Sequence, residues 1–124
     1  MFVQRAPTAR AAQELLELNA VDLLIIKPMM FGSFTDLNVT KKLADSPNTD
    51  IIFTTSLENK IGRTITAILA SCWGSKNYAH GLSTASLFNE ENSILNEVVD
   101  GHFVLNDSPG LGISFDYNNL REII

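Results

Sequence analysis

The 124-residue sequence contains little cysteine and no long apolar run. Its one cysteine, Cys72, cannot form an internal disulfide, which fits a reducing environment. We interpret Cys72 as a buried structural thiol rather than a nucleophile, because no histidine motif accompanies it. No apolar stretch approaches the roughly 20 residues that cross a bilayer, and the N-terminal segment lacks the hydrophobic core of a signal peptide. We therefore expect a cytoplasmic protein with no membrane partner.

Basic residues are also scarce. Nine lysines and arginines face 14 acidic residues, for a net charge of −5. The basic residues are scattered and do not alternate with aromatic residues, which argues against a nucleic-acid partner. A hydrophobic content of 45% and a charged content of 19% are typical of a globular chain. Since there is no internal repeat or low-complexity linker, residues 1–124 are expected to form a single unit.

The pattern of apolar residues predicts helices that alternate with strands. Thr8 is a candidate N-cap for the first helix. Helices are predicted over 8–18, 34–44 and 61–72, with loops over 28–33 and, unless it is a short helix, over 82–87. Strands are predicted over 21–27 and 50–54, with a weaker candidate over 77–81 and extended segments over 98–107 and 113–116. Such alternation with short connections predicts right-handed crossovers and an α/β fold with a parallel sheet.

The most informative segment is the apolar run Leu23–Ile26, which leads into Lys27 and is stopped by Pro28. A continuous run of this kind indicates a strand covered on both faces, as in parallel sheets. A lysine at the carboxyl end of such a strand lies where α/β barrels place their catalytic residues. The alternative is a strand-end lysine that extends its ammonium into water.

Polar residues at the ends of the later strands are further candidates. Thr54 and Ser56 lie two residues apart, so an extended backbone would point both hydroxyls to one side; they could equally bond loop backbone. Gly81 would allow a ligand to approach the backbone closely, or it is a plain turn glycine. We interpret Glu58 as an acid of the first turn of the following helix, rather than as a partner of the site. His80 has no potential metal ligand at a suitable spacing and is interpreted as structural.

Four blocks carry a family resemblance: DLLIIKP (Asp22–Pro28), TTSLENKIG (Thr54–Gly62), HGLST (His80–Thr84) and SPGLG (Ser108–Gly112). In this order and spacing they resemble the C-terminal part of the enolase superfamily, in its mandelate racemase/muconate lactonizing enzyme group. The resemblance is strongest to the o-succinylbenzoate synthase branch. It extends over nearly all of the chain from residue 21 to residue 116.

The resemblance implies a fold that the residue pattern alone does not. Proteins of this family have a capping domain on a (β/α)₇β barrel of the TIM type. The chain would supply the C-terminal portion of that barrel, as three strand/helix units and a tail, 97–124, that packs back on the capping domain. Lys27 would be the lysine of the sixth strand. The family binds one Mg²⁺ through carboxylates on the third, fourth and fifth strands. We expect these strands to precede the chain, which would then hold no metal ligand.

The resemblance also implies a function. The complete enzyme would be a carbon–oxygen lyase of menaquinone biosynthesis that uses Mg²⁺-assisted enediolate chemistry on a small carboxylate substrate. Lys27 would hold its charge against the π face of the substrate, and Thr54, Ser56 and Gly81 would contact the substrate. The chain alone would be inactive, and would self-associate or need an N-terminal half. A dipeptide epimerase or N-acylamino acid racemase, in which Lys27 is an acid/base, and a non-catalytic packing or binding module are the alternatives.

Overall fold

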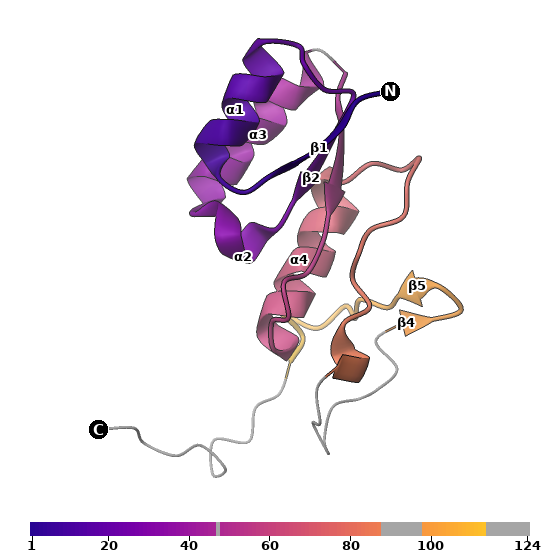
Figure 1. The fold of residues 1–124 in the computed structure, drawn as a ribbon. Helices are drawn as coiled ribbons and strands as arrows, with labels where there is room; N and C mark the ends of the chain where they lie inside the picture. The colour runs from indigo at the N-terminus through magenta and orange to yellow at the C-terminus, as the bar shows by residue number, and fades with distance from the viewer. Residues whose placement is uncertain (47, 88–97, 114–124) are drawn as a thin grey trace.

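The computed structural model describes residues 1–46, 48–87 and 98–113 of a mixed α/β protein (Figure 1). A parallel sheet is formed by β1 (Val3–Ala6), β2 (Leu23–Ile26) and β3 (Asp50–Phe53). The helices are α1 (Ala9–Glu17), α2 (Pro28–Phe31), α3 (Phe34–Asp45) and α4 (Lys60–Trp73), followed by the 3-10 turn η1 (Ala85–Leu87). A small antiparallel hairpin, β4 (Val98–Val99) and β5 (His102–Phe103), lies apart from this sheet. No helix within the described ranges is both long and apolar enough to cross a membrane.

The helices begin where their capping residues lie. Thr8 caps α1, as predicted, because its hydroxyl accepts a hydrogen bond from the N–H of Ala11. Ser33 and Asn59 cap α3 and α4 in the same way. The prediction of α1, α3 and α4, and of the strands β2 and β3, is therefore confirmed to within a few residues.

Several predictions were wrong. The strand β1 was not predicted, since three of its four residues are exposed and carry no clear alternation. The predicted loop 28–33 contains the short helix α2, which Pro28 begins because its missing N–H is not needed there. The predicted strand 77–81 is reduced to one bridge, between Gly81 and Thr54. Cys72 is exposed near the end of α4 rather than buried. Residues 114–116 of the last predicted segment lie outside the described residues.

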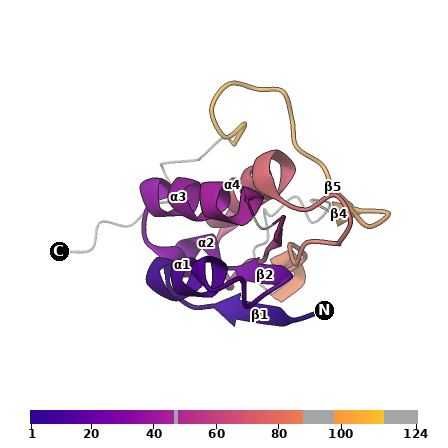
Figure 2. The same ribbon diagram turned by 90° about the horizontal axis from the view of Figure 1, so that it is seen from above.

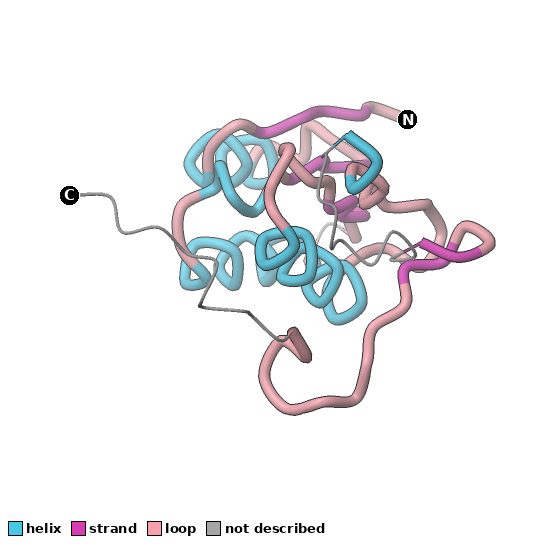
Figure 3. Tube along the Cα trace, turned by 90° about the horizontal axis from the view of Figure 1, so that it is seen from below, coloured by secondary structure: helices cyan, strands magenta, loops and turns pink. Residues whose placement is uncertain are grey.

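The strands are ordered along the sheet as they are along the chain, β1-β2-β3. Each connection returns through a helix, and right-handed crossovers place successive helices on the same face of such a sheet. Figures 2 and 3 show α1 and α3 together on one side of the strands, where they pack against each other. The helix α4 packs on β3 and continues the layer. The sheet is thus singly wound, with its helices on one face.

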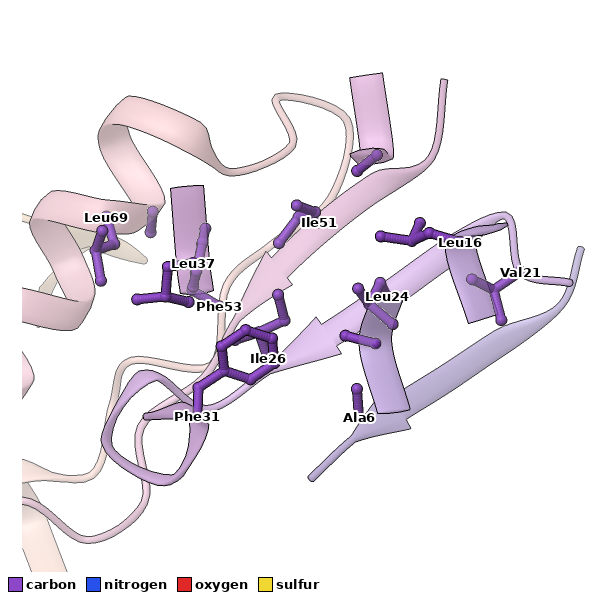
Figure 4. Close-up of a cluster of buried hydrophobic side chains, with 13 residues drawn as sticks. Ala6, Leu16, Val21, Leu24, Ile26, Phe31, Leu37, Ile51, Phe53 and Leu69 are labelled. Atoms are coloured by element: carbon purple, nitrogen blue, oxygen red, sulfur yellow. The ribbon is translucent and has the colours of Figure 1, made fainter. Parts of the chain in front are cut away.

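The hydrophobic core lies between this face and the helices (Figure 4). Leu24 is fully buried and Ile26 is 1% exposed. They point the same way as Ala6, Ile51 and Phe53 of the neighbouring strands, since alternate residues of a strand share a face. The helices contribute Leu16, Leu37 and Leu69. Burial of each leucine or isoleucine stabilises the fold by about 1.5–3 kcal/mol.

The opposite face of the sheet carries a different set of residues. Leu23 is buried, while Ile25 and Ile52 are half-buried, and none of the three belongs to the core cluster. Val3 and Arg5 of β1 share this face and are exposed. The sheet therefore presents an apolar second face that the described helices do not cover.

Candidate functional site

Three of the four predicted site residues form one row across the carboxyl end of the sheet. The register of β2 and β3 pairs Ile26 with Phe53, so the next residues, Lys27 and Thr54, lie side by side. Thr54 is bridged in parallel to Gly81. Because Ile26 and Phe53 point toward the helices, Lys27 and Thr54 point to the opposite face, which the described helices do not cover. The row therefore lies at the rim of that apolar face.

Lys27 is partly buried and does not simply extend into water. Its ammonium reaches the segment that follows β3 and donates a hydrogen bond to the main-chain carbonyl of Thr55. No acidic side chain in the part of the chain that the structure describes forms an ion pair with it. The ammonium thus brings to the rim a positive charge that is directed by one backbone acceptor and has no ion-pair partner among the described residues.

Thr54 and Gly81 are fitted to each other. A Cβ at Gly81 would lie 2.9 Å from Cγ2 of Thr54, closer than carbon atoms approach. Gly81 has no positive φ, so it is required by this close packing and not by a turn. The hydroxyl oxygen of Thr54 is buried and has no hydrogen-bond partner among the described residues, and such an unpaired group is costly unless a partner is supplied.

Ser56 lies beyond the row. Its hydroxyl is 3.5 Å from the sulfur of Met30. The neighbouring hydroxyl, that of Thr55, bonds the loop backbone instead and donates to the carbonyl of Gly81 over 3.1 Å. Met30, which is 54% exposed, provides an apolar surface beside Ser56. Met29 is 58% exposed, and its sulfur lies near Gly62 in the first turn of α4. A neutral hydroxyl, an ammonium and an apolar surface are the groups that bind a small carboxylate with an apolar body.

Glu58 was interpreted from the sequence as an acid in the first helical turn, and this is wrong. It precedes the N-cap Asn59 and is only 8% exposed. Its Oε2 accepts the N–H of Ser56 over 2.5 Å, and its Oε1 has no hydrogen-bond partner among the described residues. The main-chain carbonyl of Glu58 accepts a hydrogen bond from Arg63, which is itself fully buried. The sequence signal that could have indicated this buried position is a charged residue in a short loop between two apolar elements.

His80 is structural, as its lack of ligand-spaced neighbours indicated. Its Nδ1 accepts the N–H of Phe53 over 3.1 Å, which leaves the proton on Nε2, 3.1 Å from the carbonyl of Ser75. The imidazole thus pairs the free edge of β3 in place of a strand. Burial lowers the pKa of His80, the hydrogen bond to Ser75 acts against this change, and the charge of Lys76 adds to it.

A large hollow among the described residues lies elsewhere. It has a volume of about 890 Å³ and separates α4 from segment 75–83 and the β4–β5 hairpin. Neither Lys27 nor Thr54 lines this hollow. His80 does, but both of its ring nitrogens are hydrogen-bonded to main-chain groups. We favour the rim of the sheet as the candidate site, because a directed ammonium, a buried carboxylate and an unpaired hydroxyl meet there.

The chain was compared with protein-family models, with curated proteins and with solved structures, and no match was found.

Proposed function

We propose that the chain forms the C-terminal part of an enolase-type (β/α)₇β barrel and serves a dehydratase of the o-succinylbenzoate synthase type. The observation that carries the proposal is the singly wound sheet with Lys27 at its rim. A doubly wound fold reverses direction and covers both faces with helices. A sheet with helices on one face can instead cover its second face by curving into a barrel, where strand-end residues surround the substrate.

The proposal places each strand in the order of the barrel. If β2 with Lys27 is the sixth strand, β3 is the seventh, and the segment of Gly81 is the eighth. β1 then takes the fifth place, which the sequence alone had assigned to a strand preceding the chain. The residues that end β1 and follow it are Ala6, Pro7 and Thr8, and none is an acid.

The described residues do not fit the Mg²⁺ that the family resemblance implies. Mg²⁺ prefers several carboxylate oxygens in near-octahedral geometry. The rim offers the ammonium of Lys27 and the hydroxyls of Thr54 and Ser56. Glu58 is the acid beside them, and one of its carboxylate oxygens is already bonded to the N–H of Ser56. No step of the proposed reaction is therefore assigned to a metal held by these residues.

The rim residues suit the charge changes of a dehydration. In this reaction a C–H bond next to a carboxylate breaks, the electron pair moves into the ring, and the C–O bond breaks so that the hydroxyl leaves with a proton as water. Lys27, as a fixed cation beside an apolar surface, would stabilise the negative charge that develops on the substrate. Thr54 and Ser56 would orient its second carboxylate. An epimerase or racemase on the same scaffold, with Lys27 moving the proton, is the alternative reaction.

A non-catalytic module that binds a small carboxylate is the second candidate. The observation in its favour is the missing acid after β1, because a barrel with this strand in the fifth place would lack one metal ligand. Binding and turnover separate the two candidates.

The first experiment is a titration of the protein with 2-succinylbenzoate, followed by amide NMR shifts. The signals of Lys27, Thr54 and Gly81 should move together. Lys27→Ala should weaken binding by about 10-fold or more, since a hydrogen bond to a charged group contributes roughly 1.5–3 kcal/mol. The matched control is Lys42→Ala, on an exposed lysine of α3, which should bind as the parent does. Equal affinities of the parent and Lys27→Ala would contradict the proposed site.

Turnover then distinguishes an enzyme from a module. The chain is combined with a separately expressed polypeptide that supplies the remaining barrel strands. The reaction followed is the dehydration of the cyclohexadiene precursor of 2-succinylbenzoate. Restored turnover that is lost in Lys27→Ala and in Lys27→Arg supports the dehydratase, because the planar cation of arginine cannot occupy the same site. Binding of the product, 2-succinylbenzoate, without turnover in every combination supports the non-catalytic binding module.

A further inference from the structure

We infer that Glu58 is a positioning residue for Lys27, and that it acts through the peptide group between Thr55 and Ser56. The carbonyl oxygen of that peptide accepts the hydrogen bond of the Lys27 ammonium. The N–H of the same peptide donates to Oε2 of Glu58 over 2.5 Å. One peptide group is thus held between a cation and an anion, and each end of its dipole faces the charge of opposite sign. Hydrogen bonds to charged groups are the stronger ones.

The carboxylate of Glu58 is fixed in this arrangement. A Cβ at Gly62 would lie 2.5 Å from Cβ of Glu58, so the side chain packs directly on the first turn of α4. Arg63 holds its main-chain carbonyl with a hydrogen bond of 3.0 Å. Leu57, between the peptide and Glu58, has a φ of 56°, a conformation that costs free energy for a residue with a side chain. The chain therefore turns back on itself at a cost, and the turn brings the carboxylate to the Ser56 N–H.

This geometry has a consequence for the lysine. The carbonyl of Thr55 is the one acceptor that the described residues offer to the Lys27 ammonium. If the Glu58 charge is removed, the peptide loses its anionic partner and can rotate, and the ammonium loses both a nearby negative charge and a fixed acceptor. Glu58 thus sets the direction in which Lys27 points along the rim without touching a ligand itself.

The inference deepens the proposed function, because Lys27 is the residue that is positioned. It is tested by the reactivity of the lysine and not by turnover or ligand binding. Glu58 can therefore prove to be unlinked to Lys27 while the dehydratase proposal stands. The link can also be present in a protein that has no dehydratase activity.

The experiment is limited acylation of the folded protein with an N-hydroxysuccinimide ester at mildly alkaline pH, with the rate at each lysine measured by peptide mass spectrometry. Glu58→Gln keeps the shape and the acceptor but removes the charge. It should raise the rate at Lys27 by about 3-fold or more, because removing a unit charge on the far side of one peptide group changes the interaction energy of the ammonium by roughly RT even in water. The exposed Lys42 and Lys76 serve as internal references and should not change.

The matched control is Asp45→Asn, the same exchange of carboxylate for amide beside another lysine. Asp45 forms an ion pair with Lys41 on the surface of α3. This variant should change the rate at Lys41 alone. An unchanged rate at Lys27 in folded Glu58→Gln protein would overturn the inference.

A second measurement leaves Glu58 in place and so holds even if its variant does not fold. The amide proton of Ser56 should have a downfield NMR signal, because its acceptor is a carboxylate. Lys27→Met removes the cation at the other end of the peptide and should move this signal upfield, while Lys42→Met should not. If the Ser56 signal stays in place in Lys27→Met, the two charges are not linked through the peptide.

Discussion

Mild acid is expected to destabilise the fold through His80. The imidazole accepts the N–H of Phe53 at Nδ1, and it can do so only when that nitrogen carries no proton. Protonation would place two donors face to face at the edge of β3. Burial lowers the pKa of His80 from its ordinary value of 6.5, so the unfolded chain binds more protons than the folded chain just below pH 6.5. The contribution of His80 to the free energy of unfolding is therefore complete above pH 6.5 and is lost as the pH falls below it.

The magnitude follows from linkage and from the two hydrogen bonds. A difference of one bound proton changes the free energy of unfolding by at most about 1.4 kcal/mol per pH unit. The ring is only partly buried, so water solvates some of the charge and the observed slope should be smaller. Loss of both hydrogen bonds of the ring, to Phe53 and to Ser75, would cost about 1–3 kcal/mol. His80→Ala should thus lower the free energy of unfolding by this amount at neutral pH.

Urea unfolding at about pH 7.5 and about pH 5.5 provides the assay. His80→Asn is the diagnostic variant, because its amide oxygen can still accept the Phe53 N–H but does not titrate in this range. It should be less stable than the parent at the higher pH and should lose less stability on acidification. His102→Asn, on the exposed strand β5, should behave as the parent does. Equal losses of stability in the parent and in His80→Asn would refute the reasoning.

Three further substitutions test the packing around the site. Gly74→Ala should destabilise the fold by about 1–3 kcal/mol in urea unfolding, because the new Cβ would lie 2.3 Å from Cε1 of His80. Gly81→Ala should also destabilise the fold by about 1–3 kcal/mol. Much of this stability should be recovered in the double variant with Thr54→Ser, which removes the methyl group that the new Cβ meets, and no recovery would contradict the packing. Leu24→Ala, at a fully buried position, should lower the free energy of unfolding by about 2–5 kcal/mol.

The sequence by itself determined the elements whose signals are local. The capping residue Thr8, the run Leu23–Ile26 and the stop at Pro28 each act within a few residues, so α1 and β2 were found with nearly correct bounds. The row of Lys27, Thr54 and Gly81 was foreseen as a set of strand-end residues, because parallel strands end at the same edge of a sheet.

The tertiary structure alone decided what depends on contacts between distant residues. β1 has too few apolar residues to be recognised, and it is a strand because the edge of β2 pairs with it. The hydrogen bond from Lys27 to Thr55 joins residues 28 positions apart, and that from Phe53 to His80 joins residues 27 apart. Whether a charge such as that of Glu58 is solvated or buried is decided by the elements that pack over it. The local sequence around Glu58 is the same whether its charge is solvated or buried. It therefore predicted an acid in the first turn of the helix, whereas the fold buries Glu58 before that helix begins.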